Sequence, residues 1–336
     1  MSMPSSATFH FTDPEAYQSA VRPARLELCL TGRGEFHAQL TQIELGRLWI
    51  QAGVESLPRI SNTLTSAKRP PIIFLSDAAQ PGCRYGGVEV SASAVVVNSA
   101  GSTHHLTTSG PARWAAMSLT PDDLTAAAQA LFGHALSTPP LTYIANPDPA
   151  HMRRMVRLHA TAVRLAHSAS ATLAHPEVAR ALEHALVRAM LSCLADDPEV
   201  SVERRVRHHA TILARLEEFL AANRSRPIYL AEICAAVGAS ERTLRVCCDE
   251  HLGMGPIRYL WLRRMHLARQ ALSLADPVTT TVTEVATRFG FWELGRFAVS
   301  YRRLFGEPPS VSLHRAPRGP SRPQNSPSDF ADFSIS

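Results

Sequence analysis

Arginines recur at outward positions of two short segments in the carboxy-terminal third of the chain. In LAEICAAVGASERTLRVCCDEHLG, Arg242 and Arg245 lie off the apolar face. In TVTEVATRFGFWELGRFAVSYRRLFG, Arg296, Arg302 and Arg303 do the same. A guanidinium group donates paired hydrogen bonds to phosphate oxygens and to the O6 and N7 edge of guanine. The side chains at these positions are therefore suited to binding nucleic acid.

Each segment has the spacing of two amphipathic helices joined by a glycine. In the second segment the apolar residues Val282, Val285, Ala286 and Phe289 follow the i, i+3, i+4, i+7 rhythm and Gly290 ends the helix. In the first, Gly238 is the break and Ser240 is placed to cap the next helix. The intervening IRYLWLRRMHLARQALSLAD carries one continuous apolar stripe. We expect two helix-turn-helix units joined by a single helix.

The positive charge of the chain lies in the same region. Residues 201–315 hold 17 Lys and Arg against 11 Asp and Glu, whereas residues 1–200 hold 15 against 16. Phosphate neutralisation by basic residues supplies most non-specific affinity for DNA. The carboxy-terminal region is therefore the part expected to bind DNA.

The amino-terminal region has a different pattern. Short β-prone runs such as FHAQL, RLWIQA and PIIFLS occupy residues 24–119 between Gly, Pro and Ser, which predicts a sandwich or barrel. Thr120, followed by Pro and two Asp, indicates a helix that runs to Gly133. Residues 147–195 are helical. Their apolar stripe packs either within its own domain or against a second subunit and consists of Val178, Ala181, Leu182, Ala185, Leu186, Ala189, Met190, Cys193 and Leu194.

Residues from about 208 to 315 resemble the DNA-binding domain of the AraC/XylS family of bacterial transcription regulators. The resemblance rests on AAVGASERTL at 235–244, G-x-x-P at 253–256 and R-x-x-x-A-R-x-x-L at 264–272. It also rests on V-x-x-V-A-x-x-x-G-F at 282–291 and G-R-F-x-x-x-Y-R-x-x-F-G-x-x-P at 295–309. Cys248 departs from the family pattern, which usually has an aromatic residue there.

The resemblance implies a fold and a function. The expected fold is α+β, with a β-rich, cupin-like barrel and accessory helices ahead of an all-α domain of two helix-turn-helix units. The expected divisions are an effector-sensing domain at 1–146, a helical dimerisation region at 147–195, a linker at 196–207, the DNA-binding domain at 208–315 and a disordered tail at 316–336. The chain would be a transcription regulator, an activator that binds promoter DNA and RNA polymerase as a homodimer.

Motif alignment and helical phase identify the side chains expected at the DNA. They are Ser240, Arg242, Thr243, Arg245 and Val246 in the first unit and Glu293, Leu294, Gly295, Arg296, Val299, Arg302 and Arg303 in the second. Arg302 and Arg303 would touch phosphates or solvent.

By the same analogy, the front domain would hold an unidentified small-molecule effector. The candidate lining residues are His37, Trp49, Arg59, His104, His105 and Trp114. The alternatives are a front domain that binds a partner protein and a cupin-type metal enzyme. The enzyme is disfavoured because adjacent His104 and His105 would point to opposite faces of a strand and no acidic residue follows until Asp122.

Other enzyme and membrane classes find no support in the sequence. Cys29 and Cys83 do not form the zinc-binding cysteine cluster of methyl-acceptor repair activators, and no nucleophile motif is present. We expect no enzymatic activity, no metal and no cofactor. The start of the chain lacks the features of a secretory signal, and no apolar run approaches 20 residues. We therefore expect a cytoplasmic, nucleoid-associated protein without membrane contact.

Overall fold

The computed structural model describes residues 4–22, 24–195, 204–224, 226 and 228–315. The predicted disordered tail and most of the predicted linker lie outside the described residues. Within them, none of the helices has the length and apolar character needed to span a lipid bilayer.

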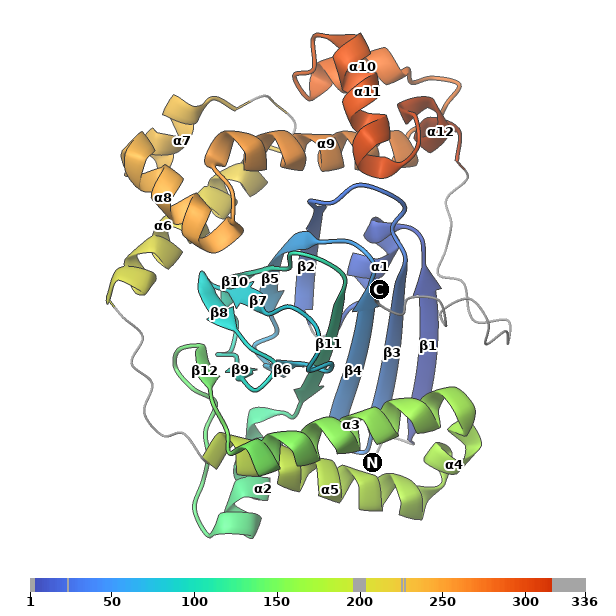
Figure 1. Cartoon of the computed structure of the whole chain (residues 1–336), viewed down its shortest axis with the longest axis vertical. Coiled ribbons are helices and arrows are strands. Elements are labelled where there is room, and N and C mark those ends of the chain that lie inside the picture. Colours follow the sequence, from blue (N-terminus) through green and yellow to red (C-terminus); the bar gives the residue numbers. More distant parts are fainter. Residues whose placement is uncertain (1–3, 23, 196–203, 225, 227, 316–336) are drawn as a thin grey trace.

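The amino-terminal region contains two antiparallel sheets in the middle of the molecule (Figure 1). The seven-stranded sheet has the order β1 (Ser5–Phe11), β3 (Ala38–Leu45), β4 (Leu48–Glu55), β11 (Ala112–Ser118), β6 (Ile72–Leu75), β9 (Val95–Val97) and β12 (Tyr143–Ala145). The five-stranded sheet has the order β2 (Ala24–Leu30), β5 (Arg59–Thr65), β10 (Thr103–Thr107), β7 (Cys83–Tyr85) and β8 (Val88–Val90).

The β-rich front domain is confirmed, as two sheets rather than one closed barrel. Each sheet ends in strands that have a partner on one side only, namely β1 and β12 in one sheet and β2 and β8 in the other. Strands β7, β8, β9 and β12 are three residues long, too short to carry the pairing around a ring. Successive side chains of a strand alternate between the two faces of its sheet, and β3 is buried on both: Ala38 and Leu40 lie in one apolar cluster, and Ile43 and Leu45 lie in another.

Five helices accompany the sheets. They are α1 (Pro14–Ala20), α2 (Pro121–Phe132), α3 (Pro149–Ser168), α4 (Ser170–Ala174) and α5 (Pro176–Ala195). The predicted start and end of α2 are both correct. The Thr120 side chain accepts a hydrogen bond from the Asp123 amide, and Gly133 ends the helix in the left-handed region with φ of 75°. Helices α3 and α5 pack on each other and against the end of the larger sheet (Figure 1).

The apolar stripe of α5 packs inside its own chain. Leu186 and Met190 are buried together with Ile43 and Leu48 of the large sheet and Met155 of α3. The interpretation of this stripe as a dimer interface is therefore wrong for Leu186 and Met190. Burial against the sheet, the other alternative, holds because β3 and β4 present an apolar surface that needs a cover.

The carboxy-terminal region is all α-helix. It comprises α6 (Arg204–Ala222), α7 (Leu230–Val237), α8 (Glu241–Leu252), α9 (Pro256–Leu274), α10 (Val282–Arg288), α11 (Leu294–Phe305) and α12 (Pro309–His314). The single connecting helix is confirmed as α9. Helix α6 begins at Arg204, within the segment 196–207 that the sequence predicts as a linker.

We expect Leu186→Ala to lower the free energy of unfolding by about 2–5 kcal/mol, because the substitution leaves a cavity between α5 and the sheet. Arg188→Ala, two residues along the same helix and exposed, is the matched control and should change it by less than about 0.5 kcal/mol. Denaturant unfolding followed by circular dichroism measures both. Equal effects in the two variants would contradict the burial of this stripe.

Candidate nucleic-acid interface and effector residues

The first helix-turn-helix unit is formed by α7 and α8. Gly238 ends α7 with φ of 67°, which a side chain would disfavour, and the turn leads directly to Ser240. The Ser240 side chain accepts a hydrogen bond of 3.1 Å from the Thr243 amide and so starts α8, as predicted. Leu244, Cys247 and Cys248 are fully buried. These residues form the buried inner face of α8, and the atypical Cys248 is one of them.

The residues of the first unit that are predicted to contact DNA lie on the outer face of α8 or at its start. Ser240, Arg242 and Arg245 are exposed, and Thr243 and Val246 are half-buried beside them. The only partner that the structure gives the Arg245 side chain among the described residues is Glu241, at 3.5 Å between exposed atoms. Such exposed pairs contribute about 0–1 kcal/mol. The Arg245 guanidinium can therefore exchange this carboxylate for a phosphate or a base edge.

The second unit repeats the design with α10 and α11. Thr281 and Glu284 form a reciprocal cap at the start of α10, and Gly290 has φ of 79° as predicted. Phe297, Tyr301, Leu304 and Phe305 form the buried face of α11. The predicted contact residues that lie off this face are all exposed: Glu293, Leu294, Gly295, Arg296, Val299, Arg302 and Arg303.

Two surface features of the second unit bear on DNA contact. A Cβ added at Gly295 would meet no atom within 4 Å, so the surface there is open to the close approach of a ligand. Trp292 is 73% exposed directly before α11, and the sequence prediction did not include it. Its position next to the motif residues could have identified it as a candidate for DNA contact. The two outward helices, α8 and α11, lie near opposite ends of α9 (Figure 1).

The DNA-binding region packs against the five-stranded sheet through a buried carboxylate. Glu217 of α6 accepts hydrogen bonds from Tyr259 at 2.7 Å and Arg263 at 2.8 Å, both on α9. It also accepts them from Asn62 of β5 at 3.1 Å and His105 of β10 at 3.2 Å. Burial alone would raise the pKa of Glu217, but the His105 hydrogen bond and the Arg263 charge lower it to about 2. The carboxylate is therefore ionised and binds donors from both regions.

Further contacts extend this interface. Arg263 and Arg224 both pair with Glu27 of β2, at 3.3 and 3.0 Å. His266 donates a hydrogen bond of 3.1 Å to the Leu30 carbonyl, and burial lowers its pKa to about 4. Cys29 and Ile60 of the sheet belong to the same apolar cluster as the core of the helical region.

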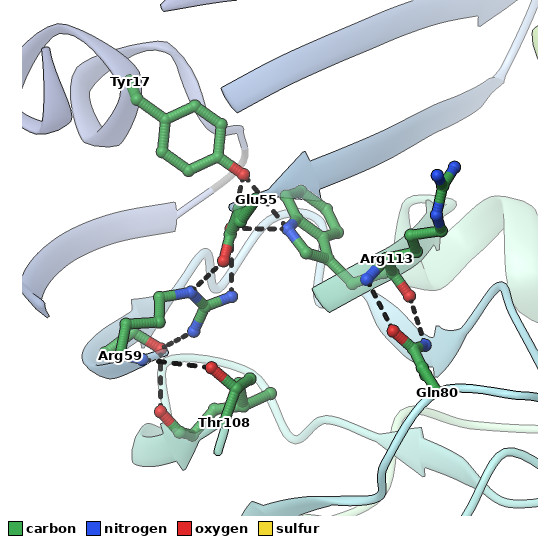
Figure 2. Close-up of polar contacts among 9 residues, drawn as sticks. Tyr17, Glu55, Arg59, Gln80, Thr108 and Arg113 are labelled. Atoms are coloured by element: carbon green, nitrogen blue, oxygen red, sulfur yellow. Dashed lines mark hydrogen bonds and ion pairs between the residues drawn. The ribbon is translucent and has the colours of Figure 1, made fainter. Parts of the chain in front are cut away.

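Arg59 and Trp114 are the two effector candidates that the structure brings together. Both donate hydrogen bonds to Glu55 in the front domain. Figure 2 shows Glu55 between Tyr17 and Arg59. Glu55 Oε1 accepts hydrogen bonds from Trp114 Nε1 at 2.8 Å, from the Tyr17 hydroxyl at 2.6 Å and from Arg59 at 3.1 Å. Burial, with the Glu55 charge, raises the pKa of Tyr17. The indole lies over Gly53, where an added Cβ would be 2.2 Å from the ring.

The other four effector candidates lie elsewhere. His37 is half-buried near Glu35, and Trp49 lies beneath the Arg69 guanidinium. His104 stacks on Tyr85, and burial lowers its pKa to about 3. His105 reaches Glu217 instead, so the prediction that the adjacent histidines point to opposite faces is correct. The six candidates therefore do not line one pocket in this structure.

The space near Arg59 and Trp114 is small. The cavity between the sheets that these residues line has a volume of about 10 Å³, and the cavity between sheet and helical region about 50 Å³. A pocket for a small ligand typically needs 300 Å³ or more. The cavity beside Arg59 and Trp114 is therefore too small for such a ligand in this conformation.

One cluster of polar side chains escaped the sequence prediction. His209 of α6 lies beside Glu250 and His251 of α8, with one ligand atom of each residue within 4.8 Å of the others. The sequence did not reveal the cluster, because His209 and Glu250 are 41 positions apart and come together only through the packing of α6 on α8.

Comparison with known proteins agrees with the geometry of the helical region. Residues 233–315 match the family model described as a helix-turn-helix domain. A probable thc operon regulatory protein of Rhodococcus erythropolis is 33% identical over 150 residues, which are 45% of this chain and 45% of that protein. XylDLEGF operon transcriptional activator 2 of Pseudomonas putida is 37% identical over 103 residues, 30% of this chain and 66% of that protein.

The chain belongs to the AraC/XylS family of regulators. A solved structure, a probable AraC family transcriptional regulator from Rhodopseudomonas palustris CGA009, is 37% identical over 30% of this chain and 94% of that one, with a TM-score of 0.28. The match covers less than half of the Rhodococcus regulator and just under two thirds of the Pseudomonas activator. The family model falls within the helical region of the chain, at residues 233–315.

For this AraC-family chain we expect Arg242→Ala and Arg296→Ala each to weaken binding to a specific site by about 1–3 kcal/mol, and to relax the preference at one base pair. Arg302→Ala and Arg303→Ala should weaken binding to all sequences alike. Arg153→Ala, exposed on α3 of the front domain, is the control. Fluorescence anisotropy on sequence variants of the site measures all five. Unchanged binding by both Arg242→Ala and Arg296→Ala would refute the placement of α8 and α11 in DNA grooves.

We expect Glu217→Gln to destabilise the chain by about 3–5 kcal/mol at pH 7, because the buried Arg263 loses the nearer of its two carboxylate partners, Glu217 at 2.8 Å, and keeps Glu27 at 3.3 Å. The pKa of Glu217 is lowered from 4.5 to about 2, so its contribution is complete above pH 4.5 and is lost as the pH falls toward 2. Glu218→Gln, its exposed neighbour, is the control. Urea unfolding between pH 7 and pH 3 measures the free energy of unfolding of both variants. If it depends on pH in the same way in both, the predicted contribution of Glu217 is contradicted.

Proposed function

We propose that the protein is a DNA-binding transcription regulator that inserts α8 and α11 into two major grooves on one face of promoter DNA. The observation that carries this is the pair of helices near the two ends of α9, each with its arginines exposed and its apolar face buried. A recognition helix reads base edges with its first residues, which here are Arg242 and Arg296. The named relatives are operon regulators, which supports the same function and gives no support to an enzymatic one.

The proposal extends to assembly and location. As an activator at promoters, the protein would contact RNA polymerase and reside in the cytoplasm at the nucleoid. A homodimer would use the outward surface of the region 147–195, because the inward stripe of α5 is already buried against the sheet. The domain divisions proposed from the sequence are supported by α3, which begins at Pro149, and by α5, which ends at Ala195.

A small-molecule effector would act on the contact between the two regions. Glu217 binds Asn62 and His105 of the front domain, so a change in β5 or β10 alters the position of α6 and α9. An effector can shift regulation only by binding two states with different affinity. The Glu55, Arg59 and Trp114 cluster is the proposed polar part of the effector site, and opening the sheets around it would produce the second state.

The closed interior of the front domain favours a second candidate. With a cavity of only about 10 Å³ beside Arg59 and Trp114, the front domain would sense a partner protein through its surface. A thermal-shift screen of metabolites separates the two readings. A metabolite that raises the melting temperature of the wild type but not of Arg59→Gln supports a small-molecule effector. If no metabolite does so and the front domain captures a defined protein, the result supports a partner protein.

The function is tested by selecting genomic DNA fragments with the full-length protein and footprinting the enriched site. We expect two protected major-groove segments about one helical turn, or about 10 base pairs, apart. Affinity should fall steeply with salt because residues 201–315 hold the excess of arginine. A chain of residues 1–195 is the control and should not bind. Absence of any enriched sequence, or salt-independent binding, would refute the proposal.

A further inference from the structure

A compact group of metal-ligand side chains lies between α6 and the end of α8, away from the proposed DNA-contacting positions. His209 projects from α6, and Glu250 and His251 are adjacent near the end of α8. One imidazole nitrogen of each histidine and one carboxylate oxygen of Glu250 lie within 4.8 Å of one another. His209 Nδ1 is 2.6 Å from Glu250 Oε2.

The donor set selects a type of ion. Two imidazoles and one carboxylate form a known zinc ligand set that leaves a fourth position for water. In a tetrahedral site with zinc–ligand distances near 2.0 Å, donor atoms are about 3.3 Å apart. The three donor atoms lie within 4.8 Å of one another, with His209 Nδ1 and Glu250 Oε2 at 2.6 Å, so binding an ion would require the side chains to rotate to that spacing. Calcium and magnesium prefer all-oxygen sites, so the nitrogen donors disfavour both ions.

The surroundings hold the ligands in place. His209 is 8% and His251 3% exposed, whereas the carboxylate side of Glu250 remains open to solvent. The β7–β8 turn of the front domain covers the His251 ring, since a Cβ added at Gly87 would lie 3.0 Å from its Cδ2 atom. Arg84 of β7 donates hydrogen bonds to the carbonyls of Glu250, at 3.0 Å, and Asp249, at 3.4 Å. Packing of this kind orients metal ligands before the ion arrives.

We propose that His209, Glu250 and His251 form a Zn²⁺ site that fastens α6 to α8 beneath the β7–β8 turn. The ion takes the position between the two rings and the carboxylate, and water completes its coordination. The Arg84 charge is directed at backbone carbonyls rather than at the carboxylate. The site does not depend on DNA binding, so it stands or falls independently of the proposed regulatory function.

The test measures zinc binding by the full-length chain, produced without a histidine tag and stripped with a chelator. Titration of Zn²⁺ against a chromophoric chelator gives stoichiometry and affinity, and Co²⁺ substitution gives visible ligand-field bands that report tetrahedral nitrogen and oxygen ligands. We expect one ion per chain. His209→Ala and Glu250→Gln should each lower affinity about tenfold or more. His184→Ala, an exposed histidine on α5, is the control and should retain wild-type affinity.

His251 is buried, so His251→Ala is interpreted only if its circular dichroism matches that of the wild type. Glu250→Gln, which preserves side-chain size at a half-exposed position, keeps the proposal testable if His251→Ala unfolds. Less than one zinc per chain in the wild type overturns the proposal. Wild-type zinc affinity in both His209→Ala and Glu250→Gln also overturns it, as does binding of Mg²⁺ with equal affinity.

Discussion

The carboxylate of Glu217 is the interaction on which the arrangement of the two regions depends. It is buried between α6, α9 and the five-stranded sheet, and its four donors come from residues spread between 62 and 263. A buried charge is tolerated only when its hydrogen bonds are satisfied. Any displacement of the sheet relative to α9 removes donors from this carboxylate, so the packing of the two regions has one strongly preferred geometry.

The arginines divide into two groups because of this arrangement. Arg263 and Arg269 of α9 pair with the front-domain carboxylates of Glu27 and Asp13, respectively. Among the described residues, the ion pairs of Arg245 and Arg296 are exposed local ones with Glu241 and Glu293. Exposed pairs are weak, so these guanidinium groups remain exchangeable. The same residue type thus holds the regions together on one side of the helical domain and leaves the other side available for an anionic surface.

The helical domain could be predicted because its signals are local. Ser240, Gly238 and Gly290 each act on the residues immediately around them, and the apolar periodicity of α11 lies within a single helix. The front domain depends on long-range pairing. Only the register that places His105 opposite Asn62 brings both toward Glu217, and no short stretch of sequence encodes it. Arg59 and Trp114 were predicted as candidates, but their shared contact with Glu55 and the closed cavity beside them follow from three-dimensional packing.

Helix α9 has 19 residues and is continuous from Pro256 to Leu274. At 1.5 Å per residue it is about 28 Å long, close to the 34 Å pitch of B-form DNA. An uninterrupted helix of this length bends little, so it keeps its two ends at a fixed distance. Inserting one base pair between the two half-sites would rotate them by roughly 34° relative to each other, an angle that α9 has no hinge to absorb. In the proposed complex with DNA, α9 would therefore select the spacing of the half-sites, in addition to their sequence.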